Sequence, residues 1–425
     1  MCLTIPKQVI SVNQRDIKVR SGKKTEKVGA IIKVKKGDWV LTINNIAIKR
    51  ISKKDAKEII ELLEKQPRTI NSVLSKEFKK IIEASYSRQL TKREIVYLLN
   101  TKGNEYKALL SEANTVRKAY LKDFICIHGI IEFSNYCRND CLYCGLRCQN
   151  KNLQRYRMTP EEIIETAQKA VDEKGYKLLV LQSGEDYYYT DEMLENIIKK
   201  IKEKCRVFIF ISIGERGRET YRKIKDAGAS GVLFRFETSN LRLFEKLHPK
   251  GKSLKKRYEH LKFFKELGYF VATGSMIGLP EQKNNDIYKD IKLMQKWANM
   301  ISMGPFIPTD DTPLGDAPND EKTKQRKIEL NLKMIAILRL LMKNVKIPVV
   351  TALETLAGEE GRKRSLLAGA NALMFNLTPS KYRPLYKIYS DKFYQKKEKW
   401  EHYGLFKFEE SYKMLEERMR KEIKI

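Results

Sequence analysis

The residues best suited to chemistry lie in one short stretch, residues 131–150. It carries four of the seven cysteines of the chain, in the order Cys137, Cys141, Cys144 and Cys148. The first three have the spacing C-x3-C-x2-C and follow an apolar run, 129–133, that predicts a buried β-strand. A loop after such a strand lies at the edge of the sheet where α/β folds place their active sites. Three thiolates there can each bind one iron of a 4Fe-4S cluster and leave the fourth iron open.

This spacing resembles the cysteine motif of the radical S-adenosylmethionine (SAM) enzymes. The resemblance implies that Cys137, Cys141 and Cys144 are catalytic cluster ligands, and that Tyr143 packs beside the adenine of SAM. The cofactors would supply the radical chemistry, while the protein supplies position and excludes water. The alternative is a structural zinc site with Cys148 as the fourth ligand. The preceding strand and the barrel pattern after the motif favour the cluster.

Composition limits the class of protein. The 425 residues have room for a large and a small domain, and 42% hydrophobic residues predict a sizeable core. No stretch reads as a signal peptide or membrane span, so we expect a cytoplasmic protein without a membrane partner. Clustered cysteines are typical of a metal site in a reducing compartment. The net charge of +31 favours polyanions. Lysines spread along the whole chain argue against a dedicated nucleic acid partner, although that alternative stays open.

Residues 1–65 differ in pattern from the rest of the chain. Short alternating or β-branched runs separated by polar turns predict a small β-barrel, followed by one helix over 52–65. The opening M-C-L-T-I-P and the later K-G-D-W-V-L resemble the HypC/HupF hydrogenase-maturation chaperones. That resemblance implies that Cys2 is a candidate iron ligand. Lys7 and Ile43 depart from the family, which usually has Gly and His there, so a docking module without iron transfer is the other interpretation.

Beyond the first domain we predict a helical extension over 66–129, a barrel over 130–390 and a basic tail with a helix over 391–425. Apolar runs alternate with amphipathic helices from residue 130 onward, which is typical of a parallel sheet. The strands are expected at 130–134, 177–183, 206–213, 230–237, 269–276, 300–306, 347–353 and 371–377. Eight strands with intervening helices predict an α/β fold, a complete (βα)8 barrel of the TIM type.

Charged and polar residues gather at the predicted strand ends, where the active site of such a barrel lies. SAM carries an ammonium, a carboxylate and a sulfonium, so it needs both acidic and basic partners. Glu185 and Glu237 are the expected acidic partners, and Arg257 is the expected partner of the carboxylate. Gly184 would let the backbone approach closely.

The same stretches resemble the FeFe-hydrogenase maturase family HydE. The likeness covers about residues 70–390 and includes R-Y-R-M-T-P-E-E-I, V-L-Q-S-G-E-D, F-E-T-S-N and G-S-M-I-G-L-P. It implies that the cofactor contacts are Gln182, Ser183, Glu185, Ser212, Glu237, Arg257, Met276 and Pro305. It also implies a substrate pocket, with a catalytic role for Arg235, made of Arg235, Met300, Thr351, Met374, Tyr382 and Tyr386.

By this resemblance the chain is a radical SAM enzyme of hydrogenase assembly. The substrate would be a cysteine-bound iron carbonyl cyanide precursor, whose sulfur is attacked by the adenosyl radical. Other hydrogenase maturation proteins and an electron donor such as a ferredoxin or flavodoxin are the implied partners. Radical chemistry on a small amino acid-like or RNA substrate is the alternative, and a non-catalytic scaffold is a third.

Three features depart from the HydE pattern. Val350 stands where the family often has a second Thr beside Thr351. No cysteine follows Cys205, so the optional second cluster of the family has no counterpart. The tail after Ser390, with a helix predicted over 408–423, is basic and unlike the family.

Overall fold

The computed structural model describes residues 6–13, 16–21, 24–30, 32–43, 46–64, 74–121 and 125–392. The candidate iron ligand Cys2 and the helix predicted over 408–423 lie outside the described residues. In the part of the chain described, every helix is too short or too polar to cross a membrane.

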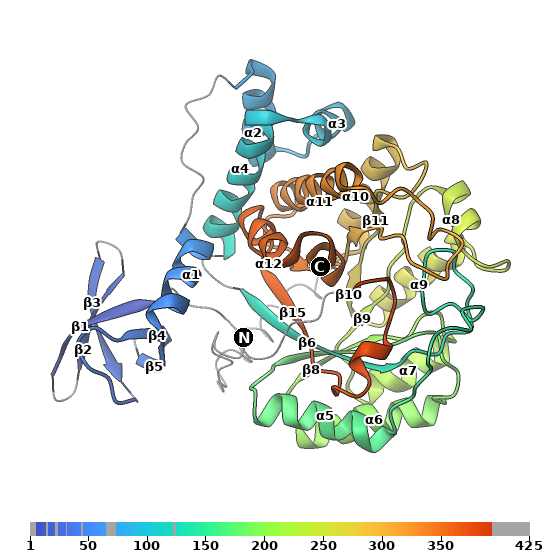
Figure 1. Cartoon of the computed structure of the whole chain (residues 1–425), viewed down its shortest axis with the longest axis horizontal. Helices are drawn as coiled ribbons and strands as arrows, with labels where there is room; N and C mark the ends of the chain where they lie inside the picture. Colours follow the sequence, from blue (N-terminus) through green and yellow to red (C-terminus); the bar gives the residue numbers. More distant parts are fainter. Residues whose placement is uncertain are drawn as a thin grey trace.

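A small closed barrel opens the fold (Figure 1), as the sequence predicts. Its strand order is β1 (Lys7–Val12), β2 (Ile17–Ser21), β3 (Lys24–Ala30), β5 (Ile46–Ile51) and β4 (Trp39–Ile43). Alternate side chains point inward and form its core, among them Val9, Val19 and Val40. The sequence analysis missed β5, because its short run follows directly on β4. Helix α1 (Lys53–Glu64) comes next, with the Ser52 hydroxyl accepting from the Asp55 N–H at 3.0 Å.

The helical extension consists of α2 (Lys76–Ser87), α3 (Lys92–Asn100) and α4 (Gly103–Leu121). A capping box begins α3: the Glu94 N–H donates to the Thr91 hydroxyl, and the Thr91 N–H donates to the Glu94 carboxylate at 2.7 Å. The inner face of α4 is buried and includes Leu109, Ala113 and Val116. This face joins the extension to the same hydrophobic core as the large barrel.

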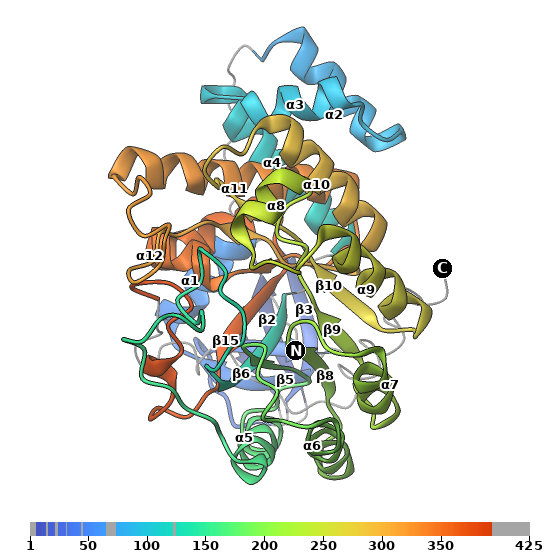
Figure 2. The same cartoon turned by 90° about the vertical axis from the view of Figure 1, so that its right-hand side faces the viewer.

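The large barrel has the predicted eight parallel strands, surrounded by helices (Figure 2). Their order is β12 (Met300–Ile301), β10 (Phe270–Thr273), β9 (Gly231–Leu233), β8 (Phe208–Ser212), β7 (Leu178–Ser183), β6 (Cys126–Ser134), β15 (Ala372–Asn376) and β14 (Pro348–Val349). A bridge between Met300 and Lys346 closes the ring, and the Ile301 N–H donates to the Lys346 carbonyl at 2.8 Å. The complete (βα)8 barrel is therefore confirmed.

Eight helices follow or separate these strands. They are α5 (Pro160–Asp172), α6 (Asp191–Lys204), α7 (Arg218–Asp226), α8 (Leu241–Leu247), α9 (Leu254–Glu266), α10 (Asn284–Trp297), α11 (Glu321–Leu341) and α12 (Thr351–Leu367). A short turn of 3₁₀-helix, η1 (Arg383–Leu385), follows β15. A second, two-stranded sheet pairs β11 (Met276–Ile277) with β13 (Gly304–Pro305) at the rim.

Several strands end earlier than the sequence predicts. Strand β9 ends at Leu233 and β14 at Val349, and Thr351 is already the first residue of α12. The reason is that the chain turns sharply at the carboxyl edge, where Glu237 has a φ of 66°. Strand β6 instead begins four residues before the predicted start, at Cys126.

The barrel interior is filled at its lower levels by apolar side chains. These include Phe208, Phe210, Phe270 and Met300, all nearly inaccessible to solvent. Burying one such side chain contributes roughly 2 to 3 kcal/mol. Since the lower interior is packed, the cavity inside the barrel lies toward the carboxyl ends of the strands.

Arg339 is the buried cation that ties α11 to the strands that close the barrel. Its guanidinium donates to the Gly369 carbonyl at 2.8 Å, to the Lys343 carbonyl at 2.8 Å and to the Asn371 amide oxygen at 2.9 Å. We expect Arg339→Met to destabilise the protein by about 3 kcal/mol, because these acceptors would stay buried without a donor. Chemical denaturation measures this, and the exposed Arg326→Met on the same helix should change stability by less than about 0.5 kcal/mol.

Candidate active site

A cavity of about 290 Å³ opens at the carboxyl ends of the barrel strands. It brings together residues that the sequence analysis selected from six different strand ends. These are Cys137, Cys144, Gln182, Ser183, Ser212, Arg235, Glu237, Arg257, Thr351, Met374 and Tyr386. Convergence of residues so distant in sequence supports a common site.

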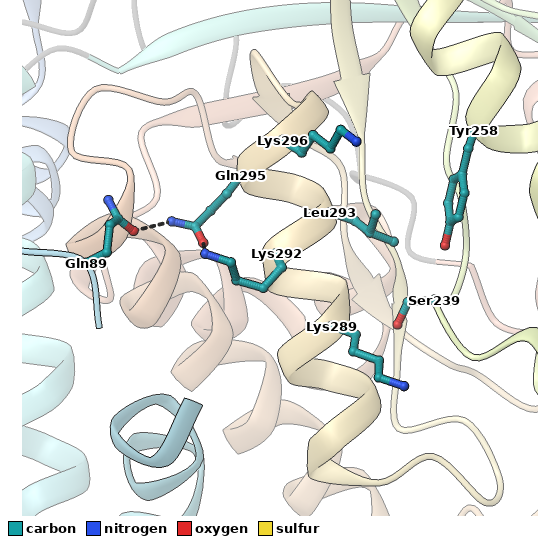
Figure 3. A pocket seen from close by; sticks show the side chains of 8 residues that line it. All are labelled: Gln89, Ser239, Tyr258, Lys289, Lys292, Leu293, Gln295 and Lys296. Carbon is teal, nitrogen blue, oxygen red and sulfur yellow. Dashed lines mark hydrogen bonds between the residues drawn. The ribbon is translucent and has the colours of Figure 1, made fainter. Parts of the chain in front are cut away.

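A larger hollow of about 680 Å³ lies outside the barrel, along α10 (Figure 3). Its lining residues are Gln89, Ser239, Tyr258, Lys289, Lys292, Leu293, Gln295 and Lys296. It contains none of the predicted site residues and no thiol or carboxylate. The chemistry therefore belongs to the smaller cavity inside the barrel.

The loop that carries the cysteines is held by one side chain, Arg155. Its guanidinium donates to four carbonyl oxygens of the loop, those of Asn135, Leu146, Arg147 and Asn150, at 2.6 to 3.2 Å. The loop has no helix or strand to satisfy these carbonyls, so the arginine replaces secondary structure. The sequence analysis did not select Arg155, because no local sequence pattern predicts that a side chain will donate to several backbone carbonyls of another segment.

Cys137, Cys141 and Cys144 have the residue type and the C-x3-C-x2-C spacing of cluster ligands. No group of three or more Cys, His, Asp or Glu side chains that could hold a metal ion is found among the described residues. A cubane cluster takes its thiolates at separate corners. Burial raises the pKa of the Cys141 thiol to about 12 and that of Cys144 well above its usual range. These thiols release their protons only when positively charged iron binds.

Tyr143, predicted to lie beside the adenine, does not line the cavity. It packs near Met276, Leu247 and Phe306 in a small apolar cluster, and its hydroxyl lies 3.1 Å from His248 Nε2. His248 Nδ1 lies 2.8 Å from the Phe244 carbonyl, which can only accept, so Nδ1 donates and Nε2 accepts from the tyrosine. Burial, together with the nearby Arg257 charge, lowers the pKa of His248 to about 4.

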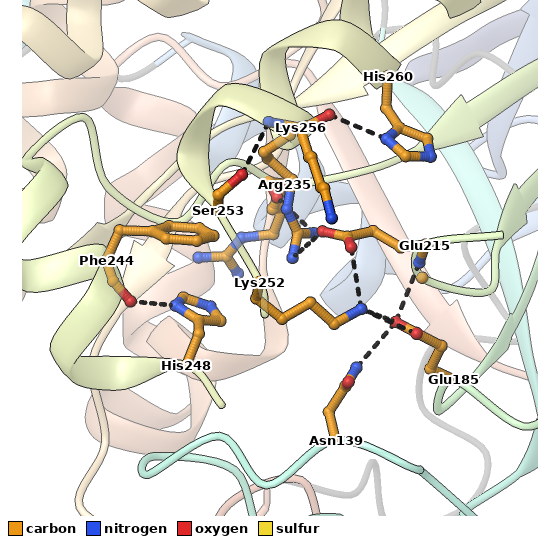
Figure 4. A network of polar contacts seen from close by, with 12 residues as sticks. Asn139, Glu185, Glu215, Arg235, Phe244, His248, Lys252, Ser253, Lys256 and His260 are labelled. Atoms are coloured by element: carbon orange, nitrogen blue, oxygen red, sulfur yellow. Dashed lines mark hydrogen bonds and ion pairs between the residues drawn. The ribbon is translucent and has the colours of Figure 1, made fainter. Parts of the chain in front are cut away.

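Glu185 has a different environment from the one expected for a SAM ligand. Figure 4 shows the Lys252 ammonium between the carboxylates of Glu185 and Glu215, at 2.9 Å from each. Glu185 also accepts from the Asn139 amide at 2.8 Å and does not line the cavity. Its backbone N–H donates to Cys137 Sγ at 3.4 Å. The carboxylate is thus saturated by protein donors, and Glu185 supports the cysteine loop rather than facing a ligand.

Unsatisfied polar atoms gather at the cavity wall formed by β9 and α9. Arg235 Nη2 and Glu237 Oε2 form an ion pair at 3.0 Å, and Arg257 Nη2 pairs with Glu215 Oε1 at 3.0 Å. The Nε atoms of Arg235 and Arg257 have no hydrogen-bond partner among the described residues. Buried polar groups are normally paired. A ligand carboxylate could accept from these arginines and a ligand ammonium could pair with Glu237, so the charges of this wall fit SAM.

Five other predicted residues lie outside the cavity lining: Cys141, Met276, Met300, Pro305 and Tyr382. Met276 and Pro305 belong to β11 and β13, where their backbones build the rim. Met300 is fully buried in the lower barrel core, because β12 places it level with Ala272. The Tyr382 hydroxyl donates to the Glu162 carboxylate at 3.0 Å, and its ring stacks on Tyr156. The sequence analysis placed Met300 and Tyr382 in the wall of the substrate cavity, and this prediction is wrong, because neither residue lines the cavity.

The cavity lining also includes residues that the sequence analysis did not select, among them Glu132, Tyr389 and Lys392. Glu132 could have been found, because it is a carboxylate at an inward position of a strand that is otherwise apolar. Tyr389 and Lys392 follow η1 without regular structure, so no periodic pattern marks their direction.

Gly184 offers a test of the cysteine loop. A Cβ there would lie 2.1 Å from the Tyr136 carbonyl oxygen and 2.8 Å from Cys137 Cβ. We expect Gly184→Ala to displace the loop and lower iron content after reconstitution at least fivefold, as measured by iron analysis and absorbance. Gly217→Ala is the matched control, since its nearest neighbour would be 3.7 Å away. Equal iron content in both variants would contradict this account.

His248 offers a test by pH. The unfolded chain protonates a histidine near pH 6.5, whereas the folded protein protonates His248 only near pH 4. Between these values the unfolded state binds more protons, so stability falls as the pH drops from about 6.5 toward 4. We expect a loss of up to about 3 kcal/mol from this group. His248→Gln should remove that part of the pH dependence in thermal unfolding, and His260→Gln should keep it.

Comparison with protein families agrees with this geometry. The Radical SAM superfamily matches residues 131–294, and the HupF/HypC family matches residues 1–63. The structure of methylornithine synthase is similar with a TM-score of 0.62, 30% identity and coverage of 70% of this chain and 85% of that chain. A structure of HydG, a maturase of the FeFe-hydrogenase, has a TM-score of 0.60 at 22% identity, covering 75% and 71% of the two chains, and so shows the fold alone.

Two individual relatives identify the family to which this chain belongs. The 3-methylornithine synthase of Methanosarcina acetivorans is 33% identical over 71% of this chain and 82% of its own length. The FeFe-hydrogenase maturase subunit HydE of Thermotoga maritima is 44% identical over 74% of this chain and 88% of its own length. The chain therefore belongs to the HydE family of radical SAM enzymes, uses a 4Fe-4S cluster and SAM as cofactors, and takes part in hydrogenase assembly with a HupF/HypC domain at its amino end.

Proposed function

We propose that this enzyme directs the 5'-deoxyadenosyl radical at a cysteine-bound iron carbonyl cyanide complex, a precursor of a hydrogenase active site. In the proposed step, C5' of the radical bonds to the cysteine sulfur as the sulfur–iron bond breaks homolytically, and the remaining electron stays with the iron carbonyl cyanide fragment, which is thereby reduced by one electron. The observation that carries the proposal is the union of two hydrogenase-maturation families in one chain. A HupF/HypC domain has no evident use beside a barrel that acts only on free amino acids.

The residues of the site have different roles in this proposal. When bound, the cluster and SAM supply the 5'-deoxyadenosyl radical after one electron arrives. Cys137, Cys141 and Cys144 would hold the cluster, and the Arg155 clasp keeps their loop in place. Arg257 would bind the carboxylate of SAM and Glu237 its ammonium, since both residues line the cavity and carry the opposite charges.

The other side of the cavity suits an uncharged or anionic metal complex. Met374 offers a soft apolar surface, while Thr351 and Tyr386 offer hydroxyl groups. A hydrogen bond from the Gln182 amide to the Tyr386 hydroxyl, at 3.2 Å, links this wall to the cofactor wall. The filled lower barrel keeps bulk water from reaching the site from below.

Partners follow from the same context. A chain with two maturation families works with other hydrogenase maturation proteins. We further propose a ferredoxin or flavodoxin as the electron donor. Such donors are acidic, and the net charge of +31 favours their encounter with this chain.

A second candidate is radical chemistry on a small amino acid-like substrate, which the 33% identity to 3-methylornithine synthase favours. Val350 lines the cavity beside Thr351 and offers no hydroxyl to a substrate. The two candidates differ in product. An amino acid substrate would lose a hydrogen atom to the 5'-deoxyadenosyl radical, and the radical would leave as 5'-deoxyadenosine. An RNA substrate rests on net charge alone and is the weakest alternative.

The test uses anaerobically reconstituted full-length protein with dithionite and SAM, with and without the synthetic iron complex. We expect an adenosyl adduct on the cysteine sulfur, seen by mass spectrometry only when the complex is present. Release of 5'-deoxyadenosine at the same rate with and without the complex would remove the iron complex as substrate. Release stimulated by an amino acid would instead favour the second candidate.

A wall variant gives a sharper prediction. Thr351→Val keeps the shape of the cavity but removes one hydroxyl donor. We expect adduct formation to fall roughly tenfold, the effect of losing one hydrogen bond to a charged group, while SAM cleavage without substrate stays within about twofold. The comparison variant Val350→Thr keeps Thr351 and adds a hydroxyl next to it. This variant should not lower adduct formation.

A further inference from the structure

A buried ion pair lines the cavity on the side away from Arg235, Glu237 and Arg257, and Glu132 of this pair lies beside Gln182 of the next strand. Glu132 lies on β6, and Lys392 lies near the end of the described chain; their side chains are 3% and 4% exposed. The Lys392 ammonium donates to the Glu132 carboxylate and, at 3.4 Å, to the Tyr386 carbonyl. The Asn376 amide donates to the other Glu132 oxygen at 2.7 Å. Both partners are residues of the cavity wall.

Stability alone is a poor reason for this pair. Removing two charges from water costs about as much as their attraction returns, so apolar side chains would serve a structural role equally well. Strand β6 is otherwise apolar at its inward positions above His128, with Ile130 next to Glu132 on the same face. Burial lowers the pKa of Lys392. A charged pair at this place is better explained by what enters the cavity.

The position of the pair separates it from the cofactor wall. Strands β7 and β8 lie between β6, which carries Glu132, and β9, which leads to Arg235 and Glu237. A ligand between the two walls would meet the cofactor groups on one side and Lys392 on the other. Tyr386 lies beside the pair, with its ring centre 4.7 Å from the ammonium.

We propose that the Lys392 ammonium, oriented by Glu132, recognises an anionic hydrogen-bond acceptor of the substrate. This deepens the proposed function, on which it rests: the acceptor is the cyanide nitrogen of the iron complex. A substrate carboxylate offers the same chemistry if the substrate is an amino acid. Lys392 is thus a substrate-binding residue, and Glu132 is a positioning residue.

The test compares Lys392→Gln with Lys387→Gln, an exposed lysine of the same segment. Reconstituted full-length protein is titrated with the synthetic iron complex, without reductant, and binding is followed by the infrared stretches of cyanide and carbon monoxide. We expect Lys392→Gln to weaken binding roughly 10- to 100-fold, as for one charge-assisted hydrogen bond, and to shift the cyanide band of bound complex. Lys387→Gln should bind within about twofold of wild type with the same spectrum.

A double variant separates recognition from folding. Lys392→Gln alone leaves the Glu132 carboxylate buried without its cation, which can disturb the fold. Glu132→Gln combined with Lys392→Gln removes both charges and should restore thermal stability and SAM binding. We expect substrate binding to stay weak in this double variant. Recovery of substrate binding to within about twofold of wild type would show a structural role only and overturn the proposal.

A second titration, with L-ornithine, separates the two sources of the acceptor. Binding of the iron complex to wild type but not to Lys392→Gln supports cyanide recognition. The same pattern with L-ornithine alone supports carboxylate recognition and counts against the proposed iron substrate. Equal binding of the iron complex to wild type and Lys392→Gln defeats this inference but leaves the proposed function intact. If wild type binds neither probe, both fail.

Discussion

The site depends on one loop whose backbone has no regular structure and must nevertheless hold three thiols in fixed positions. Arg155 meets this constraint by donating to four loop carbonyls. A guanidinium suits the task because its planar fork directs several donors at once, which a lysine cannot do. The loop is fixed further at Gly145, whose N–H donates to the Ile388 carbonyl at 2.9 Å. The cysteine loop and the segment that ends at Lys392 are therefore positioned together.

Two ionic networks lie at this edge of the barrel and have different chemical consequences. The Lys252 ammonium lies 2.9 to 3.0 Å from the carboxylates of Glu185 and Glu215, so this network supports the loop from behind. Arg235, Glu237 and Arg257 line the cavity, and the Nε atoms of both arginines have no hydrogen-bond partner among the described residues, although Arg235 pairs with Glu237 and Arg257 with Glu215. A satisfied network gives rigidity, whereas an incomplete one gives binding capacity. This contrast explains why the two glutamates expected to act alike, Glu185 and Glu237, do not.

Much of the fold follows from local pattern. Each strand predicted from residue 130 onward is present, and capping boxes at Thr91 and Thr159 begin α3 and α5. Strand ends were less accurate, since β9 and β14 stop where the chain bends toward the site. Such bends depend on contacts with distant segments, for example the Glu237 carbonyl accepting from the Met276 N–H at 2.8 Å. The local sequence pattern does not predict those contacts.

The sequence by itself determined the chemistry: the cysteine spacing, the alternation of strands and helices, and the acidic and basic residues at strand ends. These features are short-range, so residue type and spacing are enough to reveal them. Only the tertiary structure decided which charges face the cavity. It joined Glu185 to Lys252, directed Tyr382 to Glu162, and brought Lys392 to Glu132 across 260 residues of chain. Such pairings follow from packing in three dimensions, because a buried charge must find a partner wherever the fold brings one within reach.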